Sequence, residues 1–374
     1  MRIPRLPYPF TIMSLDNLPA ELIEKITSNL DQPSLASVVR TARFLREESE
    51  RFLYHSVQFY TLSHTGDLGK LQTDQVRFLE TIANCPSLGR YVIDLAVDGI
   101  GGKFKLPQMQ LMSRAFGSMV NLKSFKLHFA SSAMLNATLH PITPPSFTLT
   151  SLEITSATFI PSIEILIPFL RTQLSIRHLI VPSLVDSRRD QGEGREFDFR
   201  GTCPHLESLE GDDAIMRTML PGRKIKSIRW MYHPGNSITV LDPHDTASWM
   251  RPPFGSNVFN SVEDLALNEL TIIRLPYIAD YLVSLTHLEM TLGTEQLRYK
   301  GTIPPFAKLR RLTRLRLTLL DESRMTTEWR RSLHQDAFRA CSQLQEVWIS
   351  ESHPLNYQVF GRDGKVIRTV KVVG

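Results

Sequence analysis

The chain has 374 residues, of which 42% are hydrophobic and 22% charged, an ordinary globular composition with enough apolar side chains for a large core. Its 43 Lys and Arg and 38 Asp and Glu leave a formal net charge of only +5, so the composition does not favour a nucleic-acid-binding protein. No run reaches about 18 uncharged apolar residues, and we therefore expect no membrane-spanning helix and no membrane partner.

Cysteine usage and the first residues indicate an intracellular protein. Cys85, Cys203 and Cys341 lie far apart and do not form the two close Cys/His pairs that a zinc site uses, so we expect reduced thiols and no zinc site. Prolines interrupt residues 1–13 and break the apolar run that a secretion signal needs. We expect a flexible N-terminus there, and a cytoplasmic location, a nuclear location or both.

Three short helices are expected within residues 14–57. The first starts at Leu18-Pro19, because proline fixes φ for a first helical turn and Asn17 is a plausible N-cap. Apolar residues at every fourth position place one stripe along it, and residues 31–33 end it and open the second helix. Three such helices are too small to bury all their apolar side chains, so part of that surface is expected to contact a partner. The apolar residues are Leu18, Leu22, Ile23, Ile26, Leu30, Leu35, Val38, Val39, Phe44, Leu45, Phe52 and Leu53.

This segment resembles the F-box, whose pattern is a Leu-Pro, a helix of Leu or Ile at fourth positions, an Asp-x-x-x-Leu and a closing aromatic-rich helix. Phe44 stands near the position where many members carry a Trp or another bulky aromatic residue. The resemblance implies docking to a Skp-type adaptor of a cullin-RING ubiquitin ligase. The alternative is a helical cap that shields the end of the following domain. The implied adaptor-binding residues are Leu18, Pro19, Leu22, Ile23, Ile26, Leu30, Leu35, Val38 and Phe44.

A short pattern, apolar-x-x-apolar-x-apolar, recurs beyond residue 85. Ten copies follow one another about every 28 residues, the length of a strand-plus-helix unit. The last two apolar residues of each copy are two apart, so both face one side of a strand. Between copies, residues 73–84, 162–173 and 327–340 have the spacing of helices. The copies are VIDLAV from Val92, LKSFKL from Leu122, LTSLEI from Leu149, IRHLIV from Ile176, LESLEG from Leu206 (weak, because Gly211 ends it), IKSIRW from Ile225, VEDLAL from Val262, LTHLEM from Leu285, LTRLRL from Leu312 and LQEVWI from Leu344.

Alternating strands and helices predict an α/β solenoid of about ten units, each of which covers its apolar face by stacking on its neighbours. Residues 357–373 surround a Gly-containing turn and predict a hairpin that closes the sheet. The repeats resemble the leucine-rich-repeat horseshoe, although its usual Asn or Cys is absent, and the whole chain is similar to the irregular F-box and leucine-rich-repeat proteins common in fungi. The predicted domains are a flexible N-terminus at 1–13, a three-helix F-box at 14–57 and a leucine-rich-repeat-like domain with a C-terminal hairpin at 58–374.

The chain carries no motif that argues for an enzyme. The glycines of residues 99–103 lack the spacing of a phosphate-binding loop. Asp242, His244 and Asp245 could ligate a metal ion, but no fourth ligand is near them in the sequence. We therefore expect no catalytic residue, no cofactor and no metal site, and a role as a receptor subunit. Three long insertions, at 131–147, 186–200 and 233–260, are expected to be surface loops.

The outward-facing strand residues of a horseshoe form columns across its inner surface. Here these columns alternate in charge, which favours recognition of a protein, since a polyanion prefers a continuous basic stripe. Trp and Arg are enriched among residues that dominate binding energy. Arg229, Arg314, Arg316 and Trp348 are therefore the candidates for contact with a target protein, and Trp348 is expected to be exposed.

These features predict the substrate-recognition subunit of an SCF-type cullin-RING ubiquitin ligase. Residues 14–57 would hold a Skp-type adaptor, and through it a cullin, while the repeats bind an unidentified protein target. One alternative is a leucine-rich-repeat scaffold unconnected to ubiquitination, whose N-terminal helices cap the solenoid. A more distant alternative is an enzyme that uses the 233–260 insertion.

Overall fold

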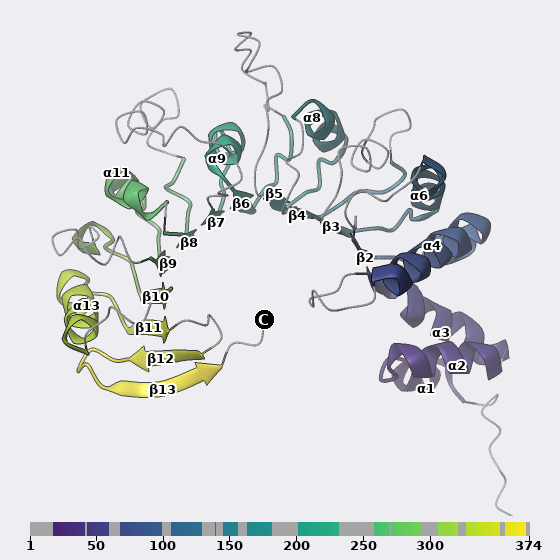
Figure 1. The fold of residues 1–374 in the computed structure, drawn as a ribbon, viewed down its shortest axis with the longest axis horizontal. Coiled ribbons are helices and arrows are strands. Elements are labelled where there is room, and N and C mark those ends of the chain that lie inside the picture. Colours follow the sequence, from purple (N-terminus) through teal and green to yellow (C-terminus); the bar gives the residue numbers. More distant parts are fainter. Residues whose placement is uncertain are drawn as a thin grey trace, which may run out of the picture.

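The strands of the chain form one continuous open sheet that curves into an arc, with the helices on its outer, convex side (Figure 1). The structure is a computed structural model, and it describes residues 18–41, 43–59, 68–98, 106–128, 139, 145–155, 163–181, 201–231, 258–269, 271–293, 306–320, 327–351 and 356–371. The sheet has 13 strands, and each strand pairs with the next one along the chain. The chain is therefore a mixed α/β protein with a solenoid-like repeat fold.

The ten copies of the apolar pattern are all strands, β2 to β11. Pairing is parallel from β1 to β11 and antiparallel from β11 to β13. One further strand, β1, was not expected; it follows the third N-terminal helix directly and pairs with β2. The strands are β1 (Ser56–Phe59), β2 (Asp94–Asp98), β3 (Ser124–His128), β4 (Ser151–Thr155), β5 (His178–Val181), β6 (Ser208–Gly211), β7 (Ser227–Trp230), β8 (Asp264–Leu267), β9 (His287–Leu292), β10 (Arg314–Leu319), β11 (Glu346–Glu351), β12 (Asn356–Phe360) and β13 (Val366–Lys371).

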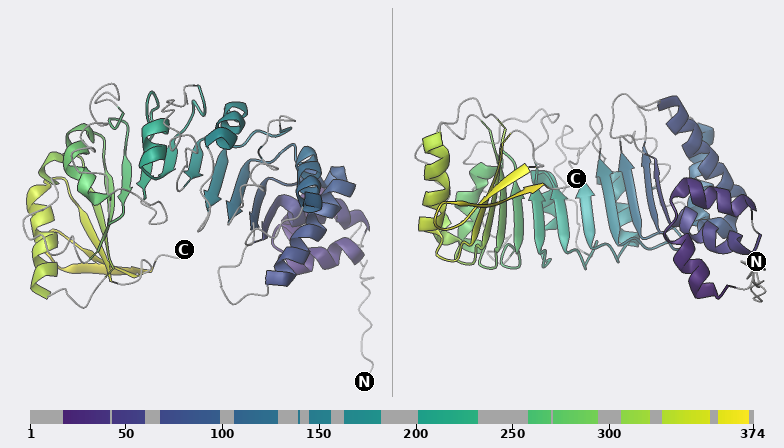
Figure 2. Two further views of the ribbon diagram at one scale, coloured as in Figure 1. Left: turned by 45° about the horizontal axis from the view of Figure 1, so that its top comes forward. Right: turned by 90° about the horizontal axis from the view of Figure 1, so that it is seen from below.

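Helices occupy the three inter-strand segments for which the apolar spacing predicts them. The N-terminal helices lie at one end of the arc, and the β12–β13 hairpin lies at the other (Figure 2). The helices are α1 (Ala20–Thr27), α2 (Gln32–Thr41), α3 (Arg43–His55), α4 (Leu68–Asn84), α5 (Pro86–Gly89), α6 (Leu106–Ser118), α8 (Ile163–Thr172), α9 (Asp213–Met219), α11 (Leu275–Ile278) and α13 (Thr327–Ala340), with short 3₁₀ turns η4 (Ile272–Arg274), η5 (Ala279–Tyr281) and η6 (Phe306–Lys308).

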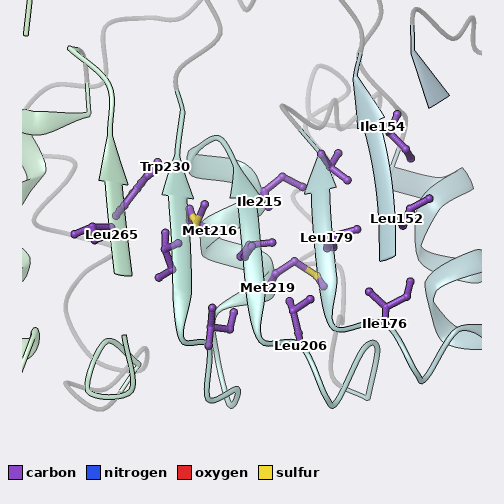
Figure 3. Packing of buried hydrophobic residues seen from close by; sticks show 14 of the residues in the cluster. Leu152, Ile154, Ile176, Leu179, Leu206, Ile215, Met216, Met219, Trp230 and Leu265 are labelled. Carbon is purple, nitrogen blue, oxygen red and sulfur yellow. The ribbon is translucent and has the colours of Figure 1, made fainter. Parts of the chain in front are cut away.

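The main core lies between the convex face of the sheet and the helices. In each repeat copy the apolar positions point into it, as Leu95 and Val97 of β2 show with exposures of 1% and 0%. Around the middle of the arc, Met219 of α9 lies toward Leu179, and Met216 of the same helix lies nearer Trp230 (Figure 3). The alternate residues of each strand therefore face the concave side, where none of the described helices lies (Figure 1).

Steric contacts explain why the weak copy LESLEG ends in a glycine, Gly211. A Cβ atom added to Gly211 would lie 2.6 Å from the carbonyl oxygen of Val181 and 2.7 Å from Cβ of Ile215 on α9. No side chain fits at these distances, so only glycine at this position lets α9 pack this closely on β6. Gly211 is thus part of the repeat and does not interrupt it.

The expected C-terminal hairpin is present. β12 pairs antiparallel with both β11 and β13, and the turn between β12 and β13 is closed by a 3.0 Å hydrogen bond from the Gly361 amide to the Lys365 carbonyl. Gly364 has a φ of 74° in this turn, a conformation that favours glycine. The hairpin extends the sheet by two strands, and β13 is its last strand.

Candidate functional site

The first candidate surface is an apolar pair on α1. Leu22 and Ile26 are 47% and 51% exposed, and their spacing of four residues places both on one face of the helix. The inward face of α1 carries Thr27, which is 1% exposed and donates its hydroxyl to the Ile23 carbonyl. The expected stripe is therefore divided, because two of its residues face solvent while a threonine faces inward.

The other expected adaptor-binding residues of this segment have mixed exposure. Pro19 is exposed and stands at the N-cap of α1, which has no side-chain cap, whereas Asn17 lies outside the described residues. Leu35 of α2 is 3% exposed and belongs to the interior of the three helices, and nothing is described of the Phe44 side chain. The half-buried residues are Leu18, Ile23, Leu30 and Val38.

Helices α1 and α2 both pack against α3, and polar contacts add to this packing. The Asp31 carboxylate accepts a 2.9 Å hydrogen bond from the Ser34 amide at the start of α2, and hydrogen bonds from Ser34 hold the pKa of this carboxyl below its usual range. Arg51 of α3 lies 3.5 Å from Glu24 of α1. The exposed apolar pair on α1 is therefore carried by a defined helical unit.

This unit is joined to the solenoid through α3. The rings of Tyr54 on α3 and Phe78 on α4 stack with centroids 6.3 Å apart, and Val57 of β1 joins the main core with 8% exposure. Because β1 follows α3 without a break and pairs with β2, the end of α3 is fixed to the first repeat.

The second candidate surface is the concave face of the sheet. The strand register aligns two columns of outward-facing residues, as the repeat pattern predicts. The first column contains Asp94, Ser124, Ser151, His178, Ser208, Ser227, Asp264, His287, Arg314 and Glu346. The second contains Ala96, Lys126, Glu153, Ile180, Glu210, Arg229, Ala266, Glu289, Arg316 and Trp348.

Charges in the second column form ion pairs between adjacent strands. Lys126 lies 2.9 Å from Glu153, Arg229 lies 3.5 Å from Glu210, and Arg316 lies 3.3 Å from Glu289. Such partly exposed pairs each contribute about 0–1 kcal/mol to stability. Their larger effect is on the charge of the concave face, because each pair neutralises one cation with one carboxylate.

Two carboxyl groups of this face are partly desolvated. Burial raises the pKa of Glu210, with a smaller effect from Glu153 in the same direction and opposition from Arg229. Burial likewise raises the pKa of Asp264, although the neighbouring His287 opposes the shift. A carboxylate is therefore less stable at these two positions than in water.

The C-terminal end of the concave face carries a compact group that we call the arginine–tryptophan cluster. It consists of Arg314, Arg316, Trp348, Tyr357, Arg368 and Glu346. The guanidinium carbons of Arg314, Arg316 and Arg368 lie 5.3, 5.4 and 5.7 Å from the centre of the Trp348 ring, within the range of cation–π attraction. Arg316 also lies over the Tyr357 ring, at 4.5 Å.

Trp348 is only 8% exposed, and the expectation of an exposed indole is wrong. Tyr357 of the hairpin packs beside it, with ring centroids 6.0 Å apart, and the three arginines surround it. Its indole N–H donates a 2.8 Å hydrogen bond to Glu346. Any partner would therefore meet the arginines before the indole.

Tyr357 and Arg368 were missed as candidate site residues. Both belong to the hairpin, where Tyr357, Val359 and Val370 form a small second core with Trp348 on the concave side. The alternation of apolar residues at 357 and 359 was the available signal, but it did not show which face of the sheet they share.

The four residues expected to contact a target are only partly brought together. Arg314, Arg316 and Trp348 are neighbours in one cluster. Arg229 is on β7, separated from β10 by two strands, and pairs with Glu210. Arg229 is therefore a separate feature of the same surface.

The remaining sequence motifs do not supply a site in the described part of the chain. Within it, no group of three or more His, Cys, Asp or Glu is placed to hold a metal ion, and no helix is long and apolar enough to cross a membrane. Asp242, His244, Asp245 and the glycines of 99–103 lie outside the described residues, as do most of the three insertions.

Comparisons with known proteins do not assign a family. No protein-family model matches the chain, and no curated protein matches it in sequence. Among solved structures, it is similar to a chain in a crystal structure of the Rad7 and Elc1 complex in yeast, with 87% of each chain covered, 13% sequence identity and a TM-score of 0.35. A likeness at this TM-score does not bear on what this chain binds.

Proposed function

We propose that the chain is the substrate-recognition subunit of an SCF-type cullin-RING ubiquitin ligase. Helices α1 to α3 serve as an F-box that binds a Skp-type adaptor, and through it a cullin. The leucine-rich-repeat-like solenoid binds a target protein on its concave face. The chain itself contributes no catalytic group, since holding the target near the ligase supplies proximity and orientation.

The observation that carries this proposal is the exposure of Leu22 and Ile26 on one face of α1. Single exposed apolar residues are common and need no explanation. These two, however, are spaced to present a continuous face, and they occupy Leu/Ile positions of the segment that resembles the F-box. Burying the exposed half of each side chain against a partner would contribute about 0.7–1.5 kcal/mol.

The concave face supports the second half of the proposal. Its columns carry both signs of charge, with cation and carboxylate on neighbouring strands. This arrangement suits a protein target, which offers complementary charges of both signs. The residues proposed to contact the target are Arg314, Arg316 and Trp348, with Arg229 as a separate contact.

A scaffold unconnected to ubiquitination is the second candidate function. The observation that favours it is the packing of Tyr54 against Phe78 and the direct run of α3 into β1, which make the N-terminal helices a plausible cap for the repeats. A cap needs no adaptor. Adaptor binding therefore separates the two functions.

The test is complex formation between the full chain and a purified Skp-type adaptor in size-exclusion chromatography. We expect co-elution as one complex, and separate elution would overturn the proposed function in favour of the scaffold. Point variants are better than removal of residues 1–57, because β1 spans Ser56–Phe59 and such a deletion cuts this strand.

A further inference from the structure

We propose that the arginine–tryptophan cluster binds an acidic, extended segment of the target protein, whose anionic side chains accept hydrogen bonds from Arg314, Arg316 and Arg368. This inference rests on the proposed function, since it names the chemistry and the place of target binding on the concave face. The two can nevertheless fail separately in experiment.

The first step of the argument is that the three guanidinium groups are held in place yet remain accessible. All three lie over the Trp348 ring, and Arg316 also lies over Tyr357. The side chains of Arg314, Arg316 and Arg368 are nevertheless 47%, 29% and 48% exposed. Stacking on an aromatic face restricts a guanidinium before binding, so less conformational entropy is lost when its N–H groups meet an anion.

The second step is that the cluster already binds a carboxylate. One oxygen of Glu346 lies 2.6 Å from Arg368, and the other lies 3.5 Å from Arg314 and accepts the Trp348 indole N–H at 2.8 Å. Burial acts to raise the pKa of this carboxyl, but the Trp348 hydrogen bond and the two arginines outweigh it and hold the pKa below its usual value. Glu346 thus shows which chemistry these donors favour.

The third step is that cations outnumber carboxylates here. Among the described residues, the three arginines contact two carboxylates, Glu346 and Glu289. Each guanidinium has several N–H donors in a fixed fork, and the contacts of these three arginines with the described residues use few of them. Elsewhere on this face, Lys126 and Arg229 each pair with one glutamate. The surplus of positive charge therefore lies at the C-terminal end.

The geometry favours a short segment that crosses the strands. The cluster and its partner Glu289 extend from β9 to β13, and five strands spaced about 4.8 Å apart span roughly 20 Å. An extended chain covers this distance with about six residues. Glu289 and Glu346 interrupt the basic surface, which disfavours a nucleic acid, because its phosphates would need a continuous basic stripe.

The test uses a fluorescein-labelled peptide of about eight residues in which Glu alternates with Ser. Matched peptides carry Gln or Lys in place of Glu, and a fourth combines Gln with phosphoserine, so that carboxylate and phosphate are compared. We expect fluorescence anisotropy to show binding of the Glu peptide at low salt, about tenfold or more tighter than the Gln peptide and weakened by added salt. Tighter binding of the phosphoserine peptide would identify phosphate as the preferred anion.

The variants locate the site. Arg316→Gln and Arg368→Gln should each weaken binding of the Glu peptide by about tenfold, whereas Lys126→Gln, on the same face and paired with Glu153, should leave it within about twofold. Arg316→Lys and Arg368→Lys retain the charge but lose the fork, and an intermediate loss is expected even if a Gln variant folds poorly. Equal binding of the Glu and Gln peptides, or equal loss in Lys126→Gln, would overturn the inference.

Adaptor binding is measured in parallel to separate the two proposals. Arg316→Gln and Arg368→Gln should still bind the Skp-type adaptor, because the cluster lies at the opposite end of the arc from α1 (Figure 1). If the adaptor binds but the Glu peptide does not, the inference is wrong and the proposed function stands. If the peptide binds but the adaptor does not, the anion site stands and the ligase role is wrong.

Discussion

The hydroxyl of Tyr357 on β12 lies 3.1 Å from the hydroxyl of Thr318 on β10, across the intervening strand β11. The register places Ser350 of β11 between them, and Ser350 is 0% exposed. Tyr357 therefore spans three strands on the concave face and joins the hairpin to the last repeats. The same ring lies beneath Arg316, so the hairpin also supports the arginine–tryptophan cluster.

Removing the Tyr357 hydroxyl should destabilise this end of the solenoid. Thr318 is 5% exposed. Tyr357→Phe leaves the buried Thr318 hydroxyl without its Tyr357 partner, which should lower the free energy of unfolding by about 1–2 kcal/mol. Urea unfolding measures the change. Adding Thr318→Val removes both polar groups, so the double variant should recover part of the loss; a fully additive loss would show that the two hydroxyls do not interact.

Gly211→Ala should destabilise the chain by about 1–3 kcal/mol, because the new Cβ would overlap Val181 and Ile215. Gly117→Ala is the matched control, since Gly117 is in α6 and a Cβ there meets nothing within 4 Å. The control should be neutral or stabilising by up to about 1 kcal/mol. Thermal unfolding of both variants checks this, and equal stability of the two would contradict the close packing of α9 on β6.

The difference in free energy of unfolding between Glu210→Gln and wild type should depend on pH. The folded pKa of Glu210 is raised above its ordinary 4.5, chiefly by burial, so ionisation above that pH costs the folded state more than the unfolded state. The contribution of Glu210 to stability therefore falls as pH rises from 4.5 through the folded pKa. Relative to wild type, Glu210→Gln should gain stability over this range in urea unfolding, and a relative loss would show that attraction to Arg229 outweighs burial.

The three cysteines should differ in reactivity. Burial raises the pKa of the Cys203 thiol to about 12 and that of Cys341 to about 11, while Cys85 is exposed. Ellman's reagent should therefore label Cys85 rapidly in the native protein, and Cys203 and Cys341 only after unfolding in denaturant. Rapid labelling of a second thiol under native conditions would contradict the burial of Cys203 or Cys341.

The sequence predicted the regular part of the fold because each repeat carries its own local signal. Alternating apolar residues identify strands β2 to β11 and also fix which side chains share a face. β1 lacks this signal, since only Val57 of its four residues is buried. The copy that ends at Gly211 looked weak in the sequence. Glycine is needed there because Ile215 on α9 packs against it, and sequence periodicity does not reveal this contact.

The candidate site was less predictable because it depends on contacts between distant segments. The repeat pattern alone places Arg314, Arg316 and Trp348 on one face of two neighbouring strands, as the register of β10 and β11 has them. Their environment depends on Tyr357 and Arg368, which reach the concave face only through the pairing of the hairpin. In the same way, the spacing of Leu22 and Ile26 predicted an apolar stripe with part of its surface left for a partner, but not which of the stripe's residues remain uncovered.

Leu22 and Ile26 are exposed on α1, so the central claim, that α1 binds a Skp-type adaptor, can be tested directly. The measurement is isothermal titration calorimetry of the adaptor into the full chain. Leu22→Asp and Ile26→Asp should each weaken adaptor binding by about tenfold or more, because each loses an apolar contact of about 0.7–1.5 kcal/mol and places a carboxylate in the interface. Val283→Asp is the matched control, since Val283 is 55% exposed and lies on the solenoid, and it should bind like wild type. Adaptor binding by wild type that is lost only in the two α1 variants, at unchanged melting temperature, is the predicted result. No binding by wild type, or equal binding by all three variants, would contradict the account.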